Sequence, residues 1–270
     1  MKTRMMLLGL IIAIMAPMIS CSKDDEGQPA AIKTFVLVHG AWQAPFVWDS
    51  VKAGLEKTGA HVVTVQLPGH GNDMTTPQTL SIDVYRDKVI SALSGIQGKV
   101  ILVGHSLGGV IISAVAEKVP SRIEKLVYIG AFLPASGQSL LDLANTDADS
   151  QLGAALVPSA DQLTLDVKRD KLIDIFVPDG TDAVKTLALA NYRAEPAIPF
   201  TNKVTLTAEN FGSVQKVYIQ TLQDRAISPA LQNRMITAAG IKTVYKLNTS
   251  HTASLAKPDS VRLLLTNIAR

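Results

Sequence analysis

Short apolar runs alternate with amphipathic segments from about residue 31 to the end of the chain. Runs rich in β-branched residues predict strands at 34–38, 61–66, 100–103, 125–129, 214–220 and 243–247. Apolar residues at helical spacing predict helices at 48–58, from Ser81 to about residue 93, and at 107–118. The prolines after Ser228 and Lys257 stand where two further helices can begin. This alternation predicts an α/β fold with a mostly parallel central sheet flanked by helices.

The alternation fails between about residues 134 and 210, where short polar and apolar stretches are interrupted by four prolines. These prolines are Pro158, Pro178, Pro196 and Pro199. An insertion of this size in a compact domain is usually a functional lid. We therefore expect a domain over residues 32–270 with a cap inserted at about 134–210.

The first twenty residues have the pattern of a signal peptide. Lys2 and Arg4 precede an almost wholly apolar stretch over residues 5–19, which is too short and wrongly flanked for a stable membrane span. Ser20 before Cys21 resembles a bacterial lipobox, which predicts a lipoprotein anchored to the membrane of a bacterial cell envelope through Cys21. The alternative is an ordinary cleavage site, which predicts a periplasmic or secreted protein. Residues 21–31 are polar and aperiodic, as in a flexible tether.

Charge and cysteine content narrow the possible partners. The chain has 26 Lys and Arg residues against 23 Asp and Glu residues, a formal charge of +3 that is not gathered into basic blocks. Nucleic acid is therefore not expected as a partner. The single cysteine, Cys21, excludes an intrachain disulfide. The oligomeric state stays open.

The segment Gly104-His105-Ser106-Leu107-Gly108 has the pattern G-x-S-x-G and lies between a predicted strand and a predicted helix. In a nucleophile elbow the serine occupies a strained turn that other chain segments approach closely, so its neighbours must be small. The N-terminus of the following helix favours a developing oxyanion. Ser106 is therefore the predicted nucleophile, and the alternative is a glycine-rich turn with an incidental serine.

His251 is the only histidine after Ser106, and it follows the last predicted strand. A loop in that place can bring the imidazole over the serine as a general base. The other candidates have structural interpretations: His61 opens a strand, His70 belongs to a turn, and His105 sits within the elbow.

Asp224 follows the strand predicted at 214–220, where a carboxylate can hold the tautomer of the base. This assignment rests on position, because an Asp in a loop is often a solvated turn residue. The competing carboxylates are Glu209, at the presumed edge of the cap, and Asp259, at the start of a helix.

His39-Gly40 follows the first strand, which is where hydrolases with this elbow place a second oxyanion-hole donor. The predicted donors are the backbone N–H groups of Ala41 and Leu107. His39 itself is expected to shape this loop and not to transfer a proton.

These motifs resemble the α/β-hydrolase group that contains the plant methyl esterases and hydroxynitrile lyases, together with bacterial relatives. The resemblance covers the chain from about Thr34 to the end and is weakest through the cap. It is carried by residues 35–42, Trp48, 104–109, 128–134, 210–214, Tyr218, Ile219, Asp224, Ile227, His251, Lys257 and Pro258. The resemblance implies an α/β-hydrolase fold, the triad Ser106, Asp224 and His251, and the oxyanion donors Ala41 and Leu107.

Two differences from the hydroxynitrile lyases of this group favour its esterase branch. Those lyases carry a Lys directly after the catalytic His and a Thr three residues before the His of His-Gly. This chain has Thr252 and Val36 at those positions, so the cation that stabilises cyanide is missing.

The sequence thus predicts a serine carboxylic-ester hydrolase that works through an acyl-enzyme on small to medium hydrophobic esters, without a metal or an organic cofactor. A hydroxynitrile lyase-like enzyme is the second hypothesis. A non-catalytic small-molecule receptor on the same fold is the third, although the complete triad argues against it.

Overall fold

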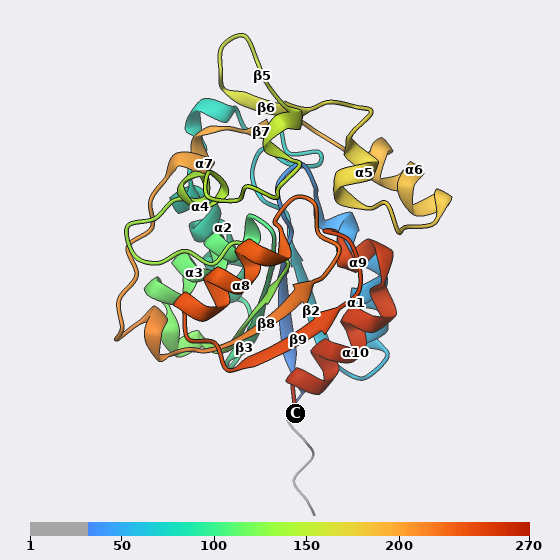
Figure 1. Cartoon of the computed structure of the whole chain (residues 1–270). Helices are drawn as coiled ribbons and strands as arrows, with labels where there is room; N and C mark the ends of the chain where they lie inside the picture. The colour runs from blue at the N-terminus through green and yellow to red at the C-terminus, as the bar shows by residue number, and fades with distance from the viewer. Residues whose placement is uncertain (1–31) are drawn as a thin grey trace, which may run out of the picture. The chain divides into compact units, whose positions relative to one another are not determined.

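Six parallel strands form the central sheet of the computed structural model, which describes residues 32–270 (Figure 1). Their order across the sheet is β2-β1-β3-β4-β8-β9, and every neighbouring pair is parallel. The strands are β1 (Thr34–Val38), β2 (His61–Val65), β3 (Val100–His105), β4 (Ile123–Ile129), β8 (Gln215–Thr221) and β9 (Thr243–Leu247). The prediction of a mostly parallel α/β sheet is confirmed.

Helices cover both faces of this sheet. On one face lie α1 (Asp49–Glu56) and α10 (Pro258–Ile268), and on the other lie α2 (Ile82–Ser94), α3 (Gly108–Lys118) and α8 (Pro229–Ala238). Successive residues of a strand point to opposite faces, so Val36 and Val38 belong to one apolar core while Phe35 and Leu37 belong to the other. Burial on both faces is the reason why these strands are continuously apolar in the sequence.

The helix boundaries depend on local chemistry. The hydroxyls of Ser81 and Ser228 accept hydrogen bonds from the backbone N–H groups of Val84 and Leu231 and cap α2 and α8. The cap at Ser81 was predicted, and α8 begins at the proline after Ser228, as expected. The helix expected at 48–58 is shorter, because the 3-10 turn η1 (Pro45–Trp48) precedes α1. Other short helical elements are η2 (Pro77–Thr79), η3 (Pro120–Arg122), η5 (Phe211–Ser213) and α9 (Ala253–Ala256).

Between β4 and β8 the chain leaves the sheet and forms short elements beside its carboxyl edge (Figure 1). The helical ones are α4 (Leu140–Ala144), η4 (Gly153–Ala155), α5 (Leu172–Phe176), α6 (Asp182–Ala190) and α7 (Ile198–Thr201). The strands β5 (Leu156–Pro158), β6 (Thr164–Val167) and β7 (Glu195–Pro196) form a small antiparallel sheet in the order β5-β6-β7. We call residues 134–210 the cap.

The predicted signal peptide, the tether and Cys21 lie outside the described residues. Within residues 32–270, no helix has the length and apolar character needed to cross a membrane.

Candidate active site

Ser106 occupies the turn between β3 and α3 with a φ of 54°. A positive φ is strained for a residue with a side chain, and it is the conformation expected of a nucleophile elbow. The flanking glycines are required by close backbone approach: a Cβ on Gly104 would lie 2.6 Å from the carbonyl oxygen of Gly108, and one on Gly109 would lie 2.2 Å from that of Phe132. The local sequence therefore matches the geometry of the turn.

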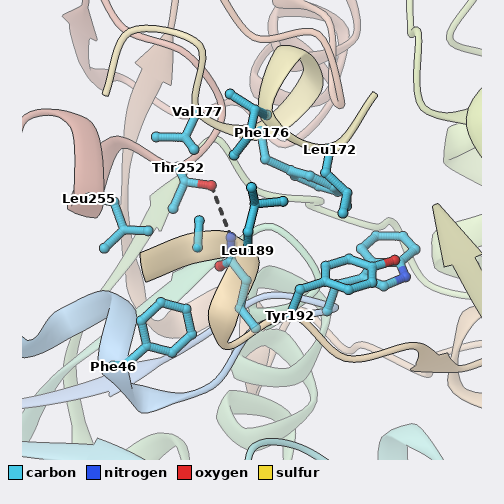
Figure 2. A pocket seen from close by; sticks show the side chains of 12 residues that line it. Phe46, Leu172, Phe176, Val177, Leu189, Tyr192, Thr252 and Leu255 are labelled. Atoms are coloured by element: carbon cyan, nitrogen blue, oxygen red, sulfur yellow. Dashed lines mark hydrogen bonds between the residues drawn. The ribbon is translucent and has the colours of Figure 1, made fainter. Parts of the chain in front are cut away.

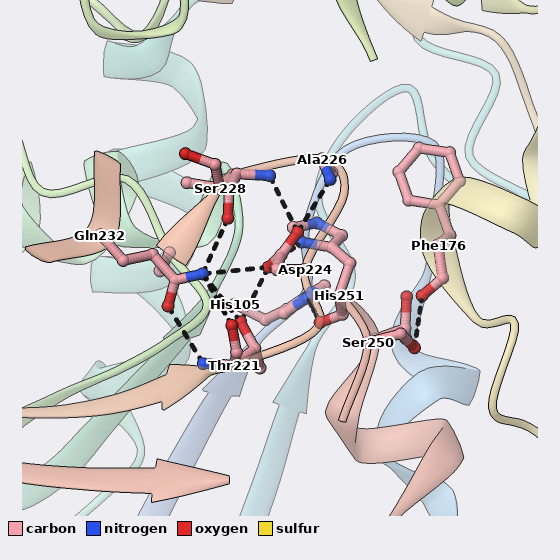
Figure 3. A network of polar contacts seen from close by, with 12 residues as sticks. His105, Phe176, Thr221, Asp224, Ala226, Ser228, Gln232, Ser250 and His251 are labelled. Carbon is pink, nitrogen blue, oxygen red and sulfur yellow. Dashed lines mark hydrogen bonds and ion pairs between the residues drawn. The ribbon is translucent and has the colours of Figure 1, made fainter. Parts of the chain in front are cut away.

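Asp224 and His251 meet in the loops that follow β8 and β9 (Figure 3). His251 Nδ1 lies 2.8 Å from Asp224 Oδ2, and both side chains are almost fully buried. In the neutral tautomer that donates from Nδ1, the Nε2 atom of His251 is left as the acceptor that a general base needs.

The carboxylate of Asp224 is held by several further donors (Figure 3). Oδ1 accepts the backbone N–H groups of Ala226 and Ile227, both at 2.8 Å, and Oδ2 accepts the hydroxyl of Thr221 at 2.8 Å. Gln232 Nε2 lies 3.4 Å from Oδ2. These contacts fix the orientation of the carboxylate and satisfy its charge within the buried site.

The two competing carboxylates lie elsewhere. The side chain of Asp259 is 95% exposed and pairs with Arg262 at 3.7 Å. Glu209 is exposed in the loop before η5. Of the three acids weighed from the sequence, Asp224 is the one that the structure brings to His251.

His105 and His39 support the site through hydrogen bonds to the backbone around it. His105 Nε2 donates to the carbonyl oxygen of His251 at 2.9 Å, and burial, together with the neighbouring His251, holds the pKa of His105 well below its ordinary value. His39 Nδ1 donates to the carbonyl of Gly40 at 2.8 Å, and its Nε2 accepts the N–H of Leu67. Burial lowers the pKa of His39 to about 3.

Ala41 and Leu107 line the same cavity as Ser106. Among the described residues, neither N–H donates a hydrogen bond to another group. The Gly40 loop approaches the nucleophile closely, because a Cβ on Gly40 would lie 2.7 Å from Ser106 Cβ. The roles of Ala41 and Leu107 as oxyanion donors stay predictions.

The cap clamps the loop that carries His251, a contact that the sequence did not reveal. Asp179 accepts hydrogen bonds from the Thr249 hydroxyl at 2.7 Å, from the Ser250 N–H at 3.2 Å and from the Ser250 hydroxyl. On the other side of His251, the N–H of Thr252 donates to the carbonyl of Phe176 at 2.8 Å. Asp179 lies in the run Pro178-Asp179-Gly180, which by itself indicates only a turn.

A second buried carboxylate of the cap, Glu195, pairs with His70. Glu195 Oε2 lies 2.8 Å from His70 Nε2 and 2.7 Å from the backbone nitrogen of Trp42. The other ring nitrogen of His70 lies 2.9 Å from the carbonyl of Pro68. Sequence reasoning treated His70 as a turn residue and gave no signal for Glu195.

The cavity above Ser106 has a volume of about 140 Å³ and is mainly apolar. Its apolar walls include Trp42, Phe132, Leu140, Leu141, Ala144, Leu152, Leu156, Leu165, Phe200 and Ile227. Asn145, Asp147 and Ser150 add polar groups, although the carboxylate of Asp147 already accepts the N–H and the hydroxyl of Ser228. Most of these walls come from the cap.

A smaller cavity of about 20 Å³ lies where Trp42 and Gln43 meet the cap, and Figure 2 shows Phe176, Leu189 and Thr252 around it. Gln43 Nε2 lies 2.9 Å from the hydroxyl of Thr252. Thr252, directly after His251, therefore places a neutral hydroxyl against the Gln43 amide. The hydroxynitrile lyases of the group that this sequence resembles carry a lysine at that position.

The model of the alpha/beta hydrolase family matches residues 35–262, which is most of the chain. The chain belongs to the alpha/beta hydrolase family. It is 32% identical to putative methylesterase 14, a chloroplastic protein of Arabidopsis thaliana, over 91% of this chain and 74% of that relative. It is 30% identical to salicylic acid-binding protein 2 of Nicotiana tabacum, over 88% of this chain and 97% of that relative.

Among solved structures, an extracellular alpha/beta-hydrolase from a Paenibacillus species superposes with a TM-score of 0.75. It is 27% identical and covers 87% of this chain and 98% of its own. That protein is described as sharing structural and functional homology with tobacco salicylic acid-binding protein 2. With the methylesterase relatives, these comparisons identify the chain as a carboxylesterase-like enzyme.

Proposed function

We propose that the protein hydrolyses carboxylic esters through an acyl-enzyme on Ser106. The 2.8 Å contact between His251 Nδ1 and Asp224 Oδ2 carries this proposal, because it prepares His251 Nε2 to accept a proton near the elbow of Ser106. The strained φ of Ser106 supports the same chemistry, as do the N–H groups of Ala41 and Leu107, which donate no hydrogen bond among residues 32–270.

The proposed reaction has two halves. Ser106 Oγ attacks the ester carbonyl while His251 Nε2 takes the hydroxyl proton, and the N–H groups of Ala41 and Leu107 stabilise the oxyanion. The tetrahedral intermediate collapses, and the alcohol leaves with the proton from His251. Water then attacks the acyl-enzyme by the same route and releases the carboxylic acid.

The substrates we propose are small to medium hydrophobic esters. Support comes from the mainly apolar cavity of about 140 Å³ that contains Ser106, since apolar walls favour an apolar acyl group. The names of the methylesterase relatives make methyl esters of hydrophobic acids the first candidates.

The test is turnover of an ester panel that varies the acyl and the alcohol part separately, with the purified protein and with Ser106→Ala. Hydrolysis of hydrophobic esters by the wild type and its loss in Ser106→Ala are the expected result. Cleavage of a cyanohydrin without ester hydrolysis would instead favour the lyase, and tight binding of an ester without turnover would favour the receptor.

We also propose that Cys21 is lipidated and anchors the enzyme to a bacterial membrane. The support is the sequence Ser20-Cys21 at the end of the apolar stretch 5–19. Labelling cells with a fatty-acid analogue should mark the wild type and not Cys21→Ala, and the variant should leave the membrane fraction. An unlabelled wild type would contradict the lipoprotein proposal and favour a periplasmic or secreted enzyme.

A further inference from the structure

Trp42 directly follows the predicted oxyanion donor Ala41 and has an uncommon backbone conformation. Its φ of 59° lies in the left-handed region, which bulky side chains rarely adopt. Such a conformation persists only where the surrounding structure holds it in place. The peptide planes that carry the N–H groups of Ala41 and Trp42 meet at the Cα atom of Ala41. The direction of the Ala41 N–H is therefore linked to that of the Trp42 N–H.

Three hydrogen bonds from the cap hold Trp42. Its backbone N–H donates to Glu195 Oε2 at 2.7 Å, its indole Nε1–H donates to the carbonyl of Leu165 at 2.8 Å, and its own carbonyl accepts the N–H of Arg193 at 3.4 Å. Leu165 on β6 and Glu195 on β7 are directly paired across the cap sheet. Two adjacent strands of the cap therefore hold the backbone and the ring of the same residue.

Glu195 is itself fixed, because His70 Nε2 donates to the same oxygen at 2.8 Å. Both ring nitrogens of His70 face acceptors, Glu195 Oε2 and the carbonyl of Pro68, and a doubly protonated ring satisfies both. Burial by itself lowers the pKa of His70, but attraction and hydrogen bonding to Glu195 outweigh it and raise the pKa above its ordinary value. The Glu195 side chain is fully buried, so water does not compete for these bonds.

We propose that Glu195 is a positioning residue for the oxyanion hole: by accepting the Trp42 N–H, it keeps the Ala41 N–H directed at the developing oxyanion. Glu195 does not line the cavity above Ser106, so it acts through Trp42 and Ala41 and not on the substrate. The proposal rests on the serine mechanism proposed above.

The test compares wild type, Glu195→Ala and Glu195→Gln in ester hydrolysis and in inhibition by an aryl trifluoromethyl ketone. Such a ketone adds reversibly to a serine hydroxyl: the Oγ–C bond forms, the carbonyl electron pair moves to oxygen, and the base takes the proton. The affinity of the adduct therefore reports on the oxyanion hole. The matching aryl methyl ketone, which resists addition, reports on ground-state binding.

In Glu195→Ala we expect kcat to fall by about 10- to 100-fold. Removal of a whole oxyanion donor lowers kcat by about 10²- to 10³-fold, and here the Ala41 N–H would be turned away from the oxyanion but would still be present. The inhibition constant of the trifluoromethyl ketone should rise by the same factor. KM and the affinity of the methyl ketone should stay within about threefold of wild type, because Glu195 does not contribute to binding of the substrate in its ground state. In Glu195→Gln the amide oxygen can accept both hydrogen bonds, so most of the activity should return.

Glu117→Ala is the matched control. Its carboxylate also holds a loop, by accepting bonds from Thr207, Asn210 and Phe211, but it lies outside the cavity above Ser106. It should lower the melting temperature while leaving kcat and the trifluoromethyl ketone affinity unchanged. Circular dichroism and melting curves confirm that each variant is folded.

The proposal is overturned if folded Glu195→Ala keeps the wild-type kcat and trifluoromethyl ketone affinity, or if KM alone rises. It is also overturned if kcat falls while the trifluoromethyl ketone affinity stays at the wild-type value. Activity that survives in folded Ser106→Ala would instead overturn the serine mechanism, so the two failures are distinguishable.

Discussion

The parallel sheet and the cap contribute to the candidate site in different ways. Ser106, Asp224 and His251 follow β3, β8 and β9, and the carboxyl ends of parallel strands meet at one edge of the sheet. The cap adds apolar walls and two carboxylates, Asp179 and Glu195, which accept hydrogen bonds from the loops that carry the proposed catalytic groups. Groups of the sheet would therefore take part in the chemistry directly, whereas groups of the cap would affect its geometry and its selectivity.

The largest expected effect belongs to the sheet. Ser106→Ala, His251→Ala and the double variant should all fall to a similar residual rate, roughly 10⁵- to 10⁶-fold below wild type, because neither partner can be activated without the other. Ester hydrolysis by the three folded proteins is the measurement. Additive losses in the double variant would show that the two residues do not act as one unit.

Asp224→Asn should have the next largest effect. The amide can keep several of the neighbouring hydrogen bonds but stabilises the wrong tautomer of His251, which costs about 10⁴-fold in a serine protease. The rate of ester hydrolysis, with circular dichroism as the control for folding, measures this effect. Near wild-type turnover here, together with inactivity of Glu209→Gln or Asp259→Asn, would make the acid assignment wrong.

Asp179→Ala should have a smaller effect, because the cap carboxylate holds the loop around His251 without touching the substrate. We expect kcat to fall by about 10- to 100-fold, which is the scale of displacing a catalytic group by about 1 Å. Asp174→Ala is the control, since the exposed Asp174 lies in the same part of the cap and pairs with the half-buried Arg225 at 3.3 Å. Equal rates for the two variants would show that the clamp at Thr249 and Ser250 does not position His251.

Asp179 should also make the thermal stability of the protein depend on pH. Burial raises its pKa, but the hydrogen bonds from Ser250 and Thr249 outweigh burial and hold the pKa below its ordinary value. The clamp should therefore be complete above the ordinary range of an Asp and weaken only as the pH falls through the lowered pKa. Melting curves recorded from neutral to acidic pH should show a decline in the wild type that is smaller in Asp179→Ala.

The strands of the sheet and the turn at Ser106 were predictable because their signals are local in the sequence. A continuous apolar run identifies β3, and the glycines around Ser106 identify the turn after it, since each of them avoids a specific backbone contact. The order of the nucleophile, acid and base along the chain then pointed to Asp224 and His251. The structure places these two residues in contact, and their catalytic roles stay predictions.

The break in the alternation of strands and helices is visible in the sequence, but the structure of the cap is not. Its helices are four to nine residues long, which is too short for a helical period to emerge from the sequence. Its carboxylates meet partners that are distant along the chain: Glu195 contacts the backbone of Trp42 across 153 positions, and Asp179 contacts Ser250 across 71. Tertiary packing creates these contacts, and no local pattern encodes them.

The smallest expected effect concerns selectivity, and it separates the two regions most clearly. Leu141 on α4 lines the cavity above Ser106 and is 38% exposed, so its truncation should leave the fold intact. Leu141→Ala should lower kcat/KM for the larger acyl groups by roughly 10-fold, which is the low end of what a lost apolar contact changes, and should leave acetyl esters unaffected. Leu187→Ala is the control, because Leu187 on α6 is 42% exposed but does not line this cavity.

The measurement is the ratio of kcat/KM for a long and a short acyl ester in each protein. A ratio that moves only in Leu141→Ala would assign acyl selectivity to the cap, whereas a uniform fall across all acyl lengths would mean that Leu141 supports the catalytic geometry and does not select the substrate.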